Sequence, residues 1–71
     1  MSKVKKKDLK KYVEKHGGEL VRLKDGNYDI RRRDRSRNIG KPDSSGKWAR
    51  SQLERAWGDA TGIKKPDAGE L

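Results

Sequence analysis

The chain has 71 residues, a length that allows one small domain at most. It has no cysteine and one histidine, which excludes a disulfide framework, a thiolate metal site and a multi-histidine metal site. Only 28% of the residues are hydrophobic, 44% are charged and the net charge is +9, so a polyanionic partner is the natural inference.

The positive charge belongs to the first half of the chain. Residues 1–15 hold seven lysines against two acidic residues, and residues 22–37 hold seven basic residues against three acidic ones. Residues 38–71 are nearly balanced, with a net charge of +1. The apolar residues gather in three patterned segments, which predicts a folded domain whose small core limits its stability to a few kcal/mol.

A helix from about Lys5 to His16 is the first predicted element. Its apolar stripe follows the helical spacing, and the members are Val4, Leu9, Tyr12, Val13 and His16. Gly17-Gly18 is the expected stop, because glycine tolerates the left-handed conformation that ends a helix. Ser2 is a candidate N-cap.

A β-hairpin is predicted next, with its turn at Asp25-Gly26-Asn27. Alternation along the two strands selects the residues expected to pack on the helix, which are Val21, Leu23, Tyr28 and Ile30. By the same alternation, Arg31 and Arg33 should face away from the core and Arg32 should lie on the core side. A short third strand over Arg35–Ile39 is an open alternative to a loop.

The last patterned segment predicts a second helix, after a loop over residues 38–46. Ser45 is its candidate N-cap and Gly62 its expected stop. The stripe that it would bury comprises Ala49, Leu53, Ala56, Trp57 and Ala60. Trp48 lies off this stripe, so it either caps the core under the loop or lies exposed as a binding anchor.

These elements predict a small single α+β domain of the form helix, β-hairpin, optional short strand and helix, with both helices on one face of a minimal sheet. The expected organisation is a flexible N-terminus over residues 1–4, a domain over residues 5–62 and a disordered tail over residues 63–71. No apolar run approaches the roughly 18 residues of a membrane span, and a cytoplasmic protein is expected.

Groups that could carry out catalysis are few. His16 suits the carbonyl end of the helix, which is a structural role. Asp25 belongs to the turn, while Asp29 and Asp34 lie among arginines that compete as partners, so a metal cluster is not expected. No phosphate-binding loop is present either. We therefore expect no enzymatic activity, no cofactor and no metal.

The stretch KDLKKYVEKHGGELVRLKDGNYDI, residues 7–30, resembles the opening of small HicA-type toxins. The resemblance implies a double-stranded-RNA-binding-like fold and cleavage of mRNA. That family carries a catalytic histidine at the second strand, where this chain has residues 27–30, Asn-Tyr-Asp-Ile. The departure removes the catalytic argument and leaves a fold analogy, with an mRNA-cleaving toxin as a third hypothesis.

The run RRRDRSRN holds five arginines in seven residues. Arginine grips phosphate or carboxylate with two parallel bonds and stacks on bases. The candidate binding residues are Arg31, Arg32, Arg33, Arg35, Arg37, Lys5, Lys6, Lys7, Lys10, Lys11, Trp48 and Arg50. Solvated surface charge is the alternative. No zinc finger, leucine zipper or helix-turn-helix pattern is present, so contact with the backbone rather than base readout is expected.

In size, basicity and lack of catalytic groups, the chain resembles the small bacteriophage proteins that bind host RNA polymerase. The resemblance implies a monomer in the host cytoplasm that binds polymerase subunits, inhibits initiation and promotes antitermination near the emerging RNA. A regulator of RNA polymerase is therefore the first hypothesis. A direct DNA- or RNA-binding module, largely independent of sequence, is the second.

Overall fold

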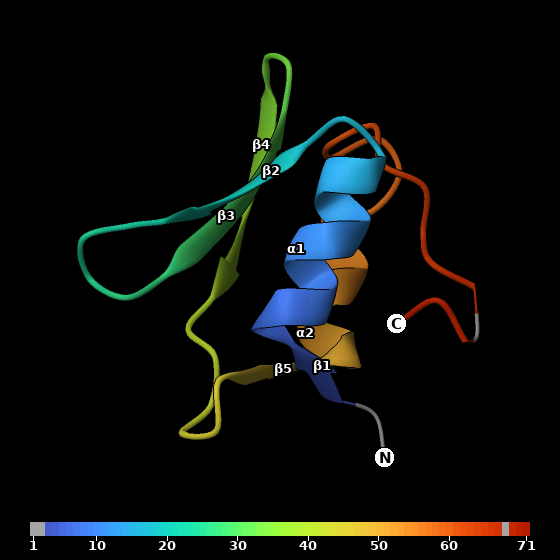
Figure 1. Cartoon of the computed structure of the whole chain (residues 1–71). Helices are drawn as coiled ribbons and strands as arrows, with labels where there is room; N and C mark the ends of the chain where they lie inside the picture. Colours follow the sequence, from blue (N-terminus) through green and yellow to red (C-terminus); the bar gives the residue numbers. More distant parts are fainter. Residues whose placement is uncertain (1–2, 68) are drawn as a thin grey trace.

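Two small antiparallel sheets and two short helices make up the computed structural model, which describes residues 3–67 and 69–71 (Figure 1). In chain order the elements are β1 (Lys3–Lys5), α1 (Lys6–Lys15), β2 (Glu19–Arg22), β3 (Tyr28–Arg32), β4 (Arg35–Gly40), β5 (Lys47–Ala49), α2 (Arg50–Leu53) and the 3-10 turn η1 (Glu54–Ala56). The α+β class predicted from the sequence is confirmed, and the optional third strand is present as β4.

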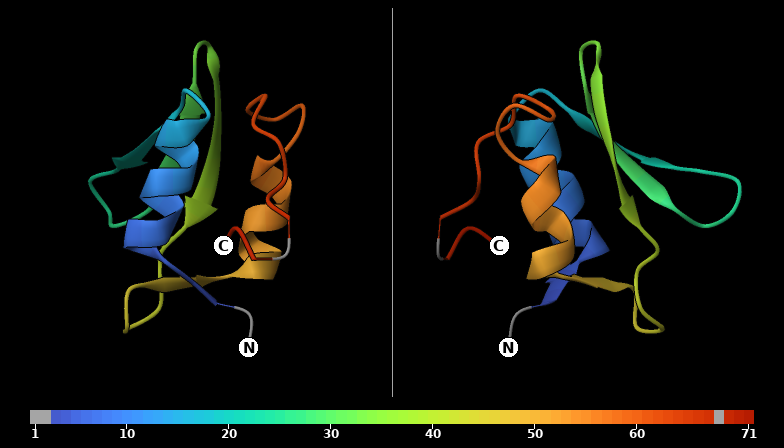
Figure 2. Two further views of the ribbon diagram at one scale, coloured as in Figure 1. Left: turned by 45° about the vertical axis from the view of Figure 1, so that its right-hand side comes forward. Right: turned by 180° about the vertical axis from the view of Figure 1, so that it is seen from behind.

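The larger sheet has the order β2-β3-β4, and the smaller one pairs β1 with β5. Figure 2 shows α1 and α2 on one side of the three-stranded sheet, as the sequence predicts, while no helix covers its other face within the described residues. The β1–β5 ribbon lies at the end of the molecule where α1 begins (Figure 1). The arginine-rich sheet therefore keeps one open face and one face against the core.

The start of α1 differs from the prediction. The helix begins at Lys6, and Val4, expected in the helical stripe, lies in β1 with 2% of its surface exposed. Val4 is paired with Trp48 across the two strands, so a β-branched side chain packs in a strand rather than a helix. Residues 3 and 4 were expected in a flexible terminus but form part of this strand. The candidate cap Ser2 lies outside the described residues.

The end of α1 confirms the predicted stop at Gly17-Gly18. Gly17 has a φ of +82° and donates its N–H to the carbonyl of Glu14, while Gly18 donates to the carbonyl of Val13. This pair of bonds is the Schellman arrangement that ends many helices. A Cβ at Gly18 would lie 2.8 Å from the carbonyl oxygen of Arg31, so glycine also permits the close approach of α1 to β3.

The predicted hairpin is present, but its core-facing residues differ on the first strand. Leu20 pairs with Ile30 in the register, so these two side chains share the face that packs on α1. Val21 pairs with Asp29 on the opposite face, and Leu23 lies beyond the end of β2. The prediction chose the wrong parity because residues 20–23 are all compatible with a strand, and only the cross-strand register distinguishes the two faces.

A second, tighter hairpin joins β3 to β4 through Arg33 and Asp34. Arg33 has a φ of +58°, a conformation that costs a residue with a side chain about 1 kcal/mol or more. The loop expected to begin at residue 38 starts later, because β4 extends to Gly40 and buries Ile39 at 4% exposure. The arginine run is thus the body and turn of a hairpin rather than the exit of a strand.

The predicted second helix is much shorter in the structure. Ser45 is not its cap, since its N–H and hydroxyl bond to Asp43 in the preceding loop. The helix begins only after β5, and Ala49 at its start donates its N–H to the Gln52 side chain. It ends at Leu53 and is followed by the 3-10 turn η1, which ends at Ala56, before Gly58 with a φ of +75°. Strand pairing at one end and a left-handed glycine at the other override the helical periodicity.

The segment after the helix contributes to the core. An isolated bridge pairs Gly58 with Ile63, and Ile63 is 1% exposed, so this first residue of the expected tail packs in the core. The hydroxyl of Tyr12 donates to the carbonyl of Lys64 at 2.6 Å. Burial, reinforced by the negative charges of nearby acidic side chains, raises the pKa of Tyr12. Leu71 also packs against the core.

Acidification is expected to weaken the fold through Asp43. One carboxylate oxygen lies 2.6 Å from Nζ of Lys3, and the other accepts the N–H groups of Ser45 and Lys47. These contacts, with the Lys3 bond largest, hold the pKa of Asp43 well below its usual value. A depressed folded-state pKa stabilises the fold above the unfolded value near pH 4, and this contribution is lost as pH falls through the folded pKa.

The thermal unfolding midpoint measured between about pH 6 and pH 2 checks this prediction. Asp43→Asn should flatten the acid limb of the profile. Asp25 is an independent second group, because its bonds with Asn27 also lower its pKa. Asp25→Asn should therefore remove a separate part of the limb, and an unchanged acid limb in Asp43→Asn would contradict the assignment.

Candidate anion-binding surface

The β3–β4 hairpin distributes its five arginines over the two faces of the sheet. Partner residues in the antiparallel register share a face. Arg31 pairs with Ser36 on the open face, whereas Arg32 pairs with Arg35, and Arg37 pairs with Ile30, on the face toward the helices. Arg32 is partly buried on the core side, as predicted, and Arg33 is exposed at the turn.

The open face carries mixed charge. Nε and Nη2 of Arg31 donate to one carboxylate oxygen of Asp29 at 3.3 and 3.1 Å. The side-chain amide of Asn38 donates to the other oxygen at 3.2 Å, and Glu19 is the register partner of Arg31 on β2. The charge of Arg31 is therefore compensated locally, and this residue contributes less to an anion-binding surface than the sequence suggests.

The face toward the helices holds arginines whose hydrogen-bond partners are neutral. Nε of Arg32 donates to the carbonyl of His16 at 3.0 Å, and Nη1 of Arg35 donates to the carbonyl of Asp59 at 2.8 Å. No carboxylate of the described residues lies within 4.0 Å of the basic nitrogens of either side chain. These bonds fix the two guanidinium groups in place and leave their charges uncompensated.

A hollow of about 290 Å³ lies between the tip of this hairpin and the turn that follows η1. It is lined by Arg32, Arg33, Asp34, Arg35 and Gly62. Gly62 lines the hollow, and the carbonyl groups of His16 and Asp59 hold two of its arginines, but no motif in the sequence marks these groups as parts of a site. The sequence predicts Gly62 only as the stop of the second helix.

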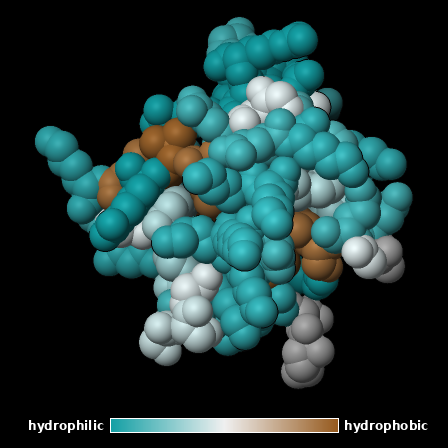
Figure 3. Space-filling view, in the orientation of Figure 1, coloured by the Kyte–Doolittle hydropathy of each residue, from teal (hydrophilic) through white to brown (hydrophobic). Residues whose placement is uncertain are grey.

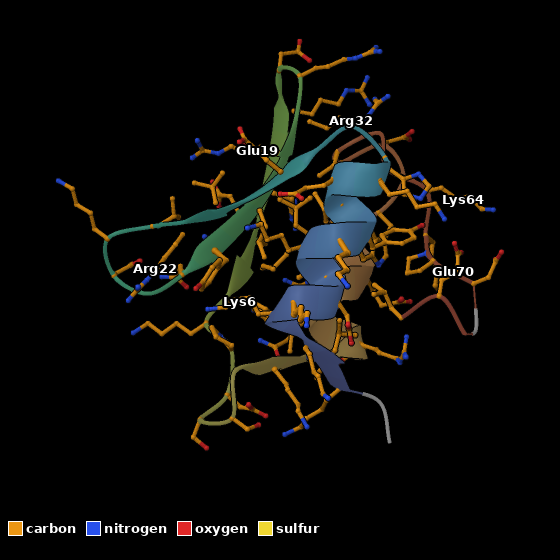
Figure 4. All side chains as sticks on the ribbon, in the orientation of Figure 1. Lys6, Glu19, Arg22, Arg32, Lys64 and Glu70 are labelled. Atoms are coloured by element: carbon orange, nitrogen blue, oxygen red, sulfur yellow. The ribbon has the colours of Figure 1, made fainter. Side chains whose placement is uncertain are left out.

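Lys6, at the start of α1, lies apart from the arginines of the hairpin. Figure 4 shows Lys6 near the start of α1 and Arg32 near the opposite end of the helix. Nζ of Lys6 lies 5.9 Å from the centre of the Tyr28 ring, and Lys5 pairs with Lys47 in the β1–β5 ribbon. The remaining predicted lysines are exposed on α1, and they are Lys7, Lys10 and Lys11.

Trp48 lies in the core rather than on the surface. It is 0% exposed, its ring meets Tyr28 edge to face at 5.1 Å, and its Nε1 donates to the carbonyl of Gly40 at 3.2 Å. Trp57, expected in the core, is only partly buried. The guanidinium of Arg50, another candidate binding residue, donates to the carbonyl of Leu71. Of the two alternatives predicted for Trp48, the structure has the one in which it packs in the core, whereas Trp57 is less buried than its place in the helical stripe predicts.

His16 packs on Tyr12 with 4.4 Å between ring centroids, and its buried Nε2 has no hydrogen-bond partner among the described residues. Across residues 3–67 and 69–71, no group of three or more His, Cys, Asp or Glu residues is placed to hold a metal ion. The face shown in Figure 3 is hydrophilic over most of its area, with small separate apolar patches. The hairpin therefore remains the most distinctive chemical feature.

Of the predicted site residues, the structure brings together Arg32, Arg33 and Arg35 around one hollow. Arg31 lies on the open face, and Lys6 lies near the end of α1 that is opposite Arg32. In the part of the chain that the structure describes, no helix is long and apolar enough to cross a membrane. Comparison of the chain with protein-family models, curated proteins and solved structures finds no match.

Proposed function

We propose that this protein is a non-enzymatic nucleic-acid-binding module that contacts the phosphate backbone through the β3–β4 hairpin. One observation carries the proposal. Arg33, Arg35 and Arg37 are exposed on the β3–β4 hairpin, and no carboxylate of the described residues forms an ion pair with them. A folded protein that keeps such charges clustered gains most from them when an anionic partner is bound.

The expected mode of binding follows from the side chains available. Arginine forks suit phosphate oxygens, and the exposed aromatic residues that would stack on bases are missing from the described strands. Phosphate contacts position a protein on nucleic acid without reading the sequence. Binding should therefore be largely independent of the nucleotide sequence. Its affinity should fall steeply as the salt concentration rises, because binding releases counterions from the nucleic acid.

A regulator of the host transcription machinery, which inhibits initiation or promotes antitermination, is the second candidate. The observation that favours it is the open face of the sheet, where Glu19, Asp29 and Arg31 lie on neighbouring strands. Mixed charge of this kind suits a protein surface better than a polyphosphate, because like charges would face the phosphates. In this second function, the hairpin would meet an acidic subunit surface or the nascent RNA.

Two measurements separate these functions. An electrophoretic shift with duplex DNA, single-stranded DNA and RNA of equal length should show binding at about 50 mM salt, with affinity falling steeply as salt rises. Failure to bind any of the three at that salt would reject the nucleic-acid-binding function. A pull-down from a nuclease-treated bacterial lysate, analysed by mass spectrometry, should recover polymerase subunits only if the second candidate is correct.

A further inference from the structure

The hollow at the hairpin tip has walls that come from two separate parts of the chain, the consecutive residues 32–35 and Gly62. Arg32, Arg33 and Arg35 supply the positive charge, Asp34 the single negative one, and Gly62 closes the side formed by the turn after η1. In Figure 4, Arg32 lies between the tip of the hairpin and the carboxyl end of α1. A site assembled from β3, β4 and residues 58–62 exists only in the folded protein.

We propose that this hollow is a preorganised subsite for one phosphate group, held between the guanidinium groups of Arg32 and Arg35. This proposal rests on the proposed function in one respect, because it takes the phosphate group to belong to a nucleic acid. Each guanidinium spends one of its N–H donors on a backbone carbonyl, of His16 or of Asp59, and keeps the others for a ligand. Because these bonds already fix the two arginines, binding costs less side-chain entropy than it would for free surface arginines.

The charge and size of the hollow suit a single phosphate. Three arginines against Asp34 leave a net charge of +2 around about 290 Å³, a space that admits a phosphate group with part of its sugar. Phosphate oxygens accept paired N–H bonds from arginine in the same planar geometry as a carboxylate. A terminal monoester and an internal diester share this chemistry, and the experiment below distinguishes them.

Gly62 keeps the hollow open. A Cβ built at this residue would lie 3.0 Å from Nη1 of Arg32, so a side chain here would press on the guanidinium that the subsite needs. Gly58, in the same turn, supplies a matched comparison, because its φ of +75° equals the +76° of Gly62 within a degree while a Cβ there would meet nothing within 4 Å. Alanine at either residue strains the backbone alike, but only Gly62→Ala disturbs Arg32.

The test is a titration of the isotope-labelled full chain with inorganic phosphate, followed by NMR at constant ionic strength with chloride as the reference salt. The amide of Gly62 and the Nε–H groups of Arg32 and Arg35 should shift and saturate. Gly62→Ala should weaken phosphate binding about tenfold, the effect of losing roughly one charge-assisted hydrogen bond, and Gly58→Ala should bind like the parent chain. Arg35→Gln, which changes an exposed side chain, should weaken binding at least as much and guards against misfolding of the glycine variants.

Shifts that track ionic strength without saturating, or equal affinities in Gly62→Ala and Gly58→Ala, would overturn the subsite. Oligonucleotides with a terminal phosphate or a terminal hydroxyl identify the source: a preference for the phosphorylated form assigns a terminal monoester, and equal affinities sensitive to Arg35→Gln assign an internal diester. Saturable phosphate binding without oligonucleotide binding at low salt would leave the subsite and reject the proposed function. Oligonucleotide binding without a saturable phosphate response would reject the subsite and leave the proposed function.

Discussion

Replacing Trp48 by alanine is expected to leave most of the protein unfolded at room temperature. The side chain is fully buried, and truncation of such a residue to alanine costs about 3–5 kcal/mol. The variant also loses the edge-to-face contact with Tyr28 and leaves the carbonyl of Gly40 without its indole donor. A domain of this size has a total stability of only about 3–5 kcal/mol, so the loss is comparable to the whole.

Trp57→Ala is the matched control, since the same truncation is made at a partly buried residue that packs edge-on against Tyr12 at 5.6 Å. This variant should retain a cooperative urea transition with a lower midpoint. Far-UV circular dichroism and urea unfolding of the two variants provide the comparison. Equal stability of Trp48→Ala and Trp57→Ala would contradict the buried position of Trp48.

Local patterns account for the parts of the fold that the sequence predicted well. The α1 stripe and Gly17-Gly18 are encoded within one stretch, because helical spacing and a left-handed glycine need no distant partner. The turn at residues 25–27 is equally local, with the N–H of Leu23 bonded to the carbonyl of Asn27. These elements require only neighbours in the chain, so a single sequence suffices to find them.

The sequence-based predictions are wrong where contacts between distant segments determine the secondary structure. Val4 and Trp48 are far apart in the chain, and only their pairing in β1 and β5 shows that both belong to strands. By local spacing alone, residues 47–60 fit one helix. In the structure the first three form strand β5, and the helical part ends before Gly58, whose φ is positive. Intrinsic propensity is a weak preference that tertiary contacts override, and these contacts are invisible in a local pattern.

The candidate site was predictable in composition but not in geometry. The sequence identified the five arginines, but it could not show that Arg31 pairs with Asp29 while Arg32 and Arg35 bond to neutral carbonyls. Every residue has a backbone carbonyl, so no residue type marks His16 or Asp59 as the partner. Charge compensation, which decides what a cationic cluster can bind, therefore had to come from the structure.

A triple variant with Arg33→Gly, Arg35→Gln and Arg37→Gln is expected to lose most nucleic-acid binding while remaining folded. Affinity should fall about 10- to 100-fold at moderate salt, since each exposed charge contact contributes about 0.5–1 kcal/mol. The slope of log affinity against log salt should decrease in magnitude by about 3, close to one per lost phosphate contact. Electrophoretic shifts over a salt series measure both quantities, and circular dichroism checks the fold.

The choice of residues follows from the contacts of the hairpin. Arg35 is included although it bonds to the Asp59 carbonyl, because its side chain is exposed. Arg32 is omitted because it is partly buried and bonded to the His16 carbonyl, and Arg31 because it pairs with Asp29. Substituting either would remove structural contacts along with charge. Glycine replaces Arg33 because the φ of +58° suits glycine, so this change should relieve backbone strain rather than add to it.

A second triple variant removes the same amount of charge elsewhere on the protein. It carries Lys7→Gln, Lys10→Gln and Lys11→Gln on the exposed side of α1, where glutamine is also a good helix former. If the hairpin is the contact surface, this variant should keep more affinity and a steeper salt dependence than the arginine variant. A binding surface defined by geometry distinguishes charges that contact the phosphates from charges that do not. Equal losses of affinity in the two variants would therefore mean that net charge alone drives binding.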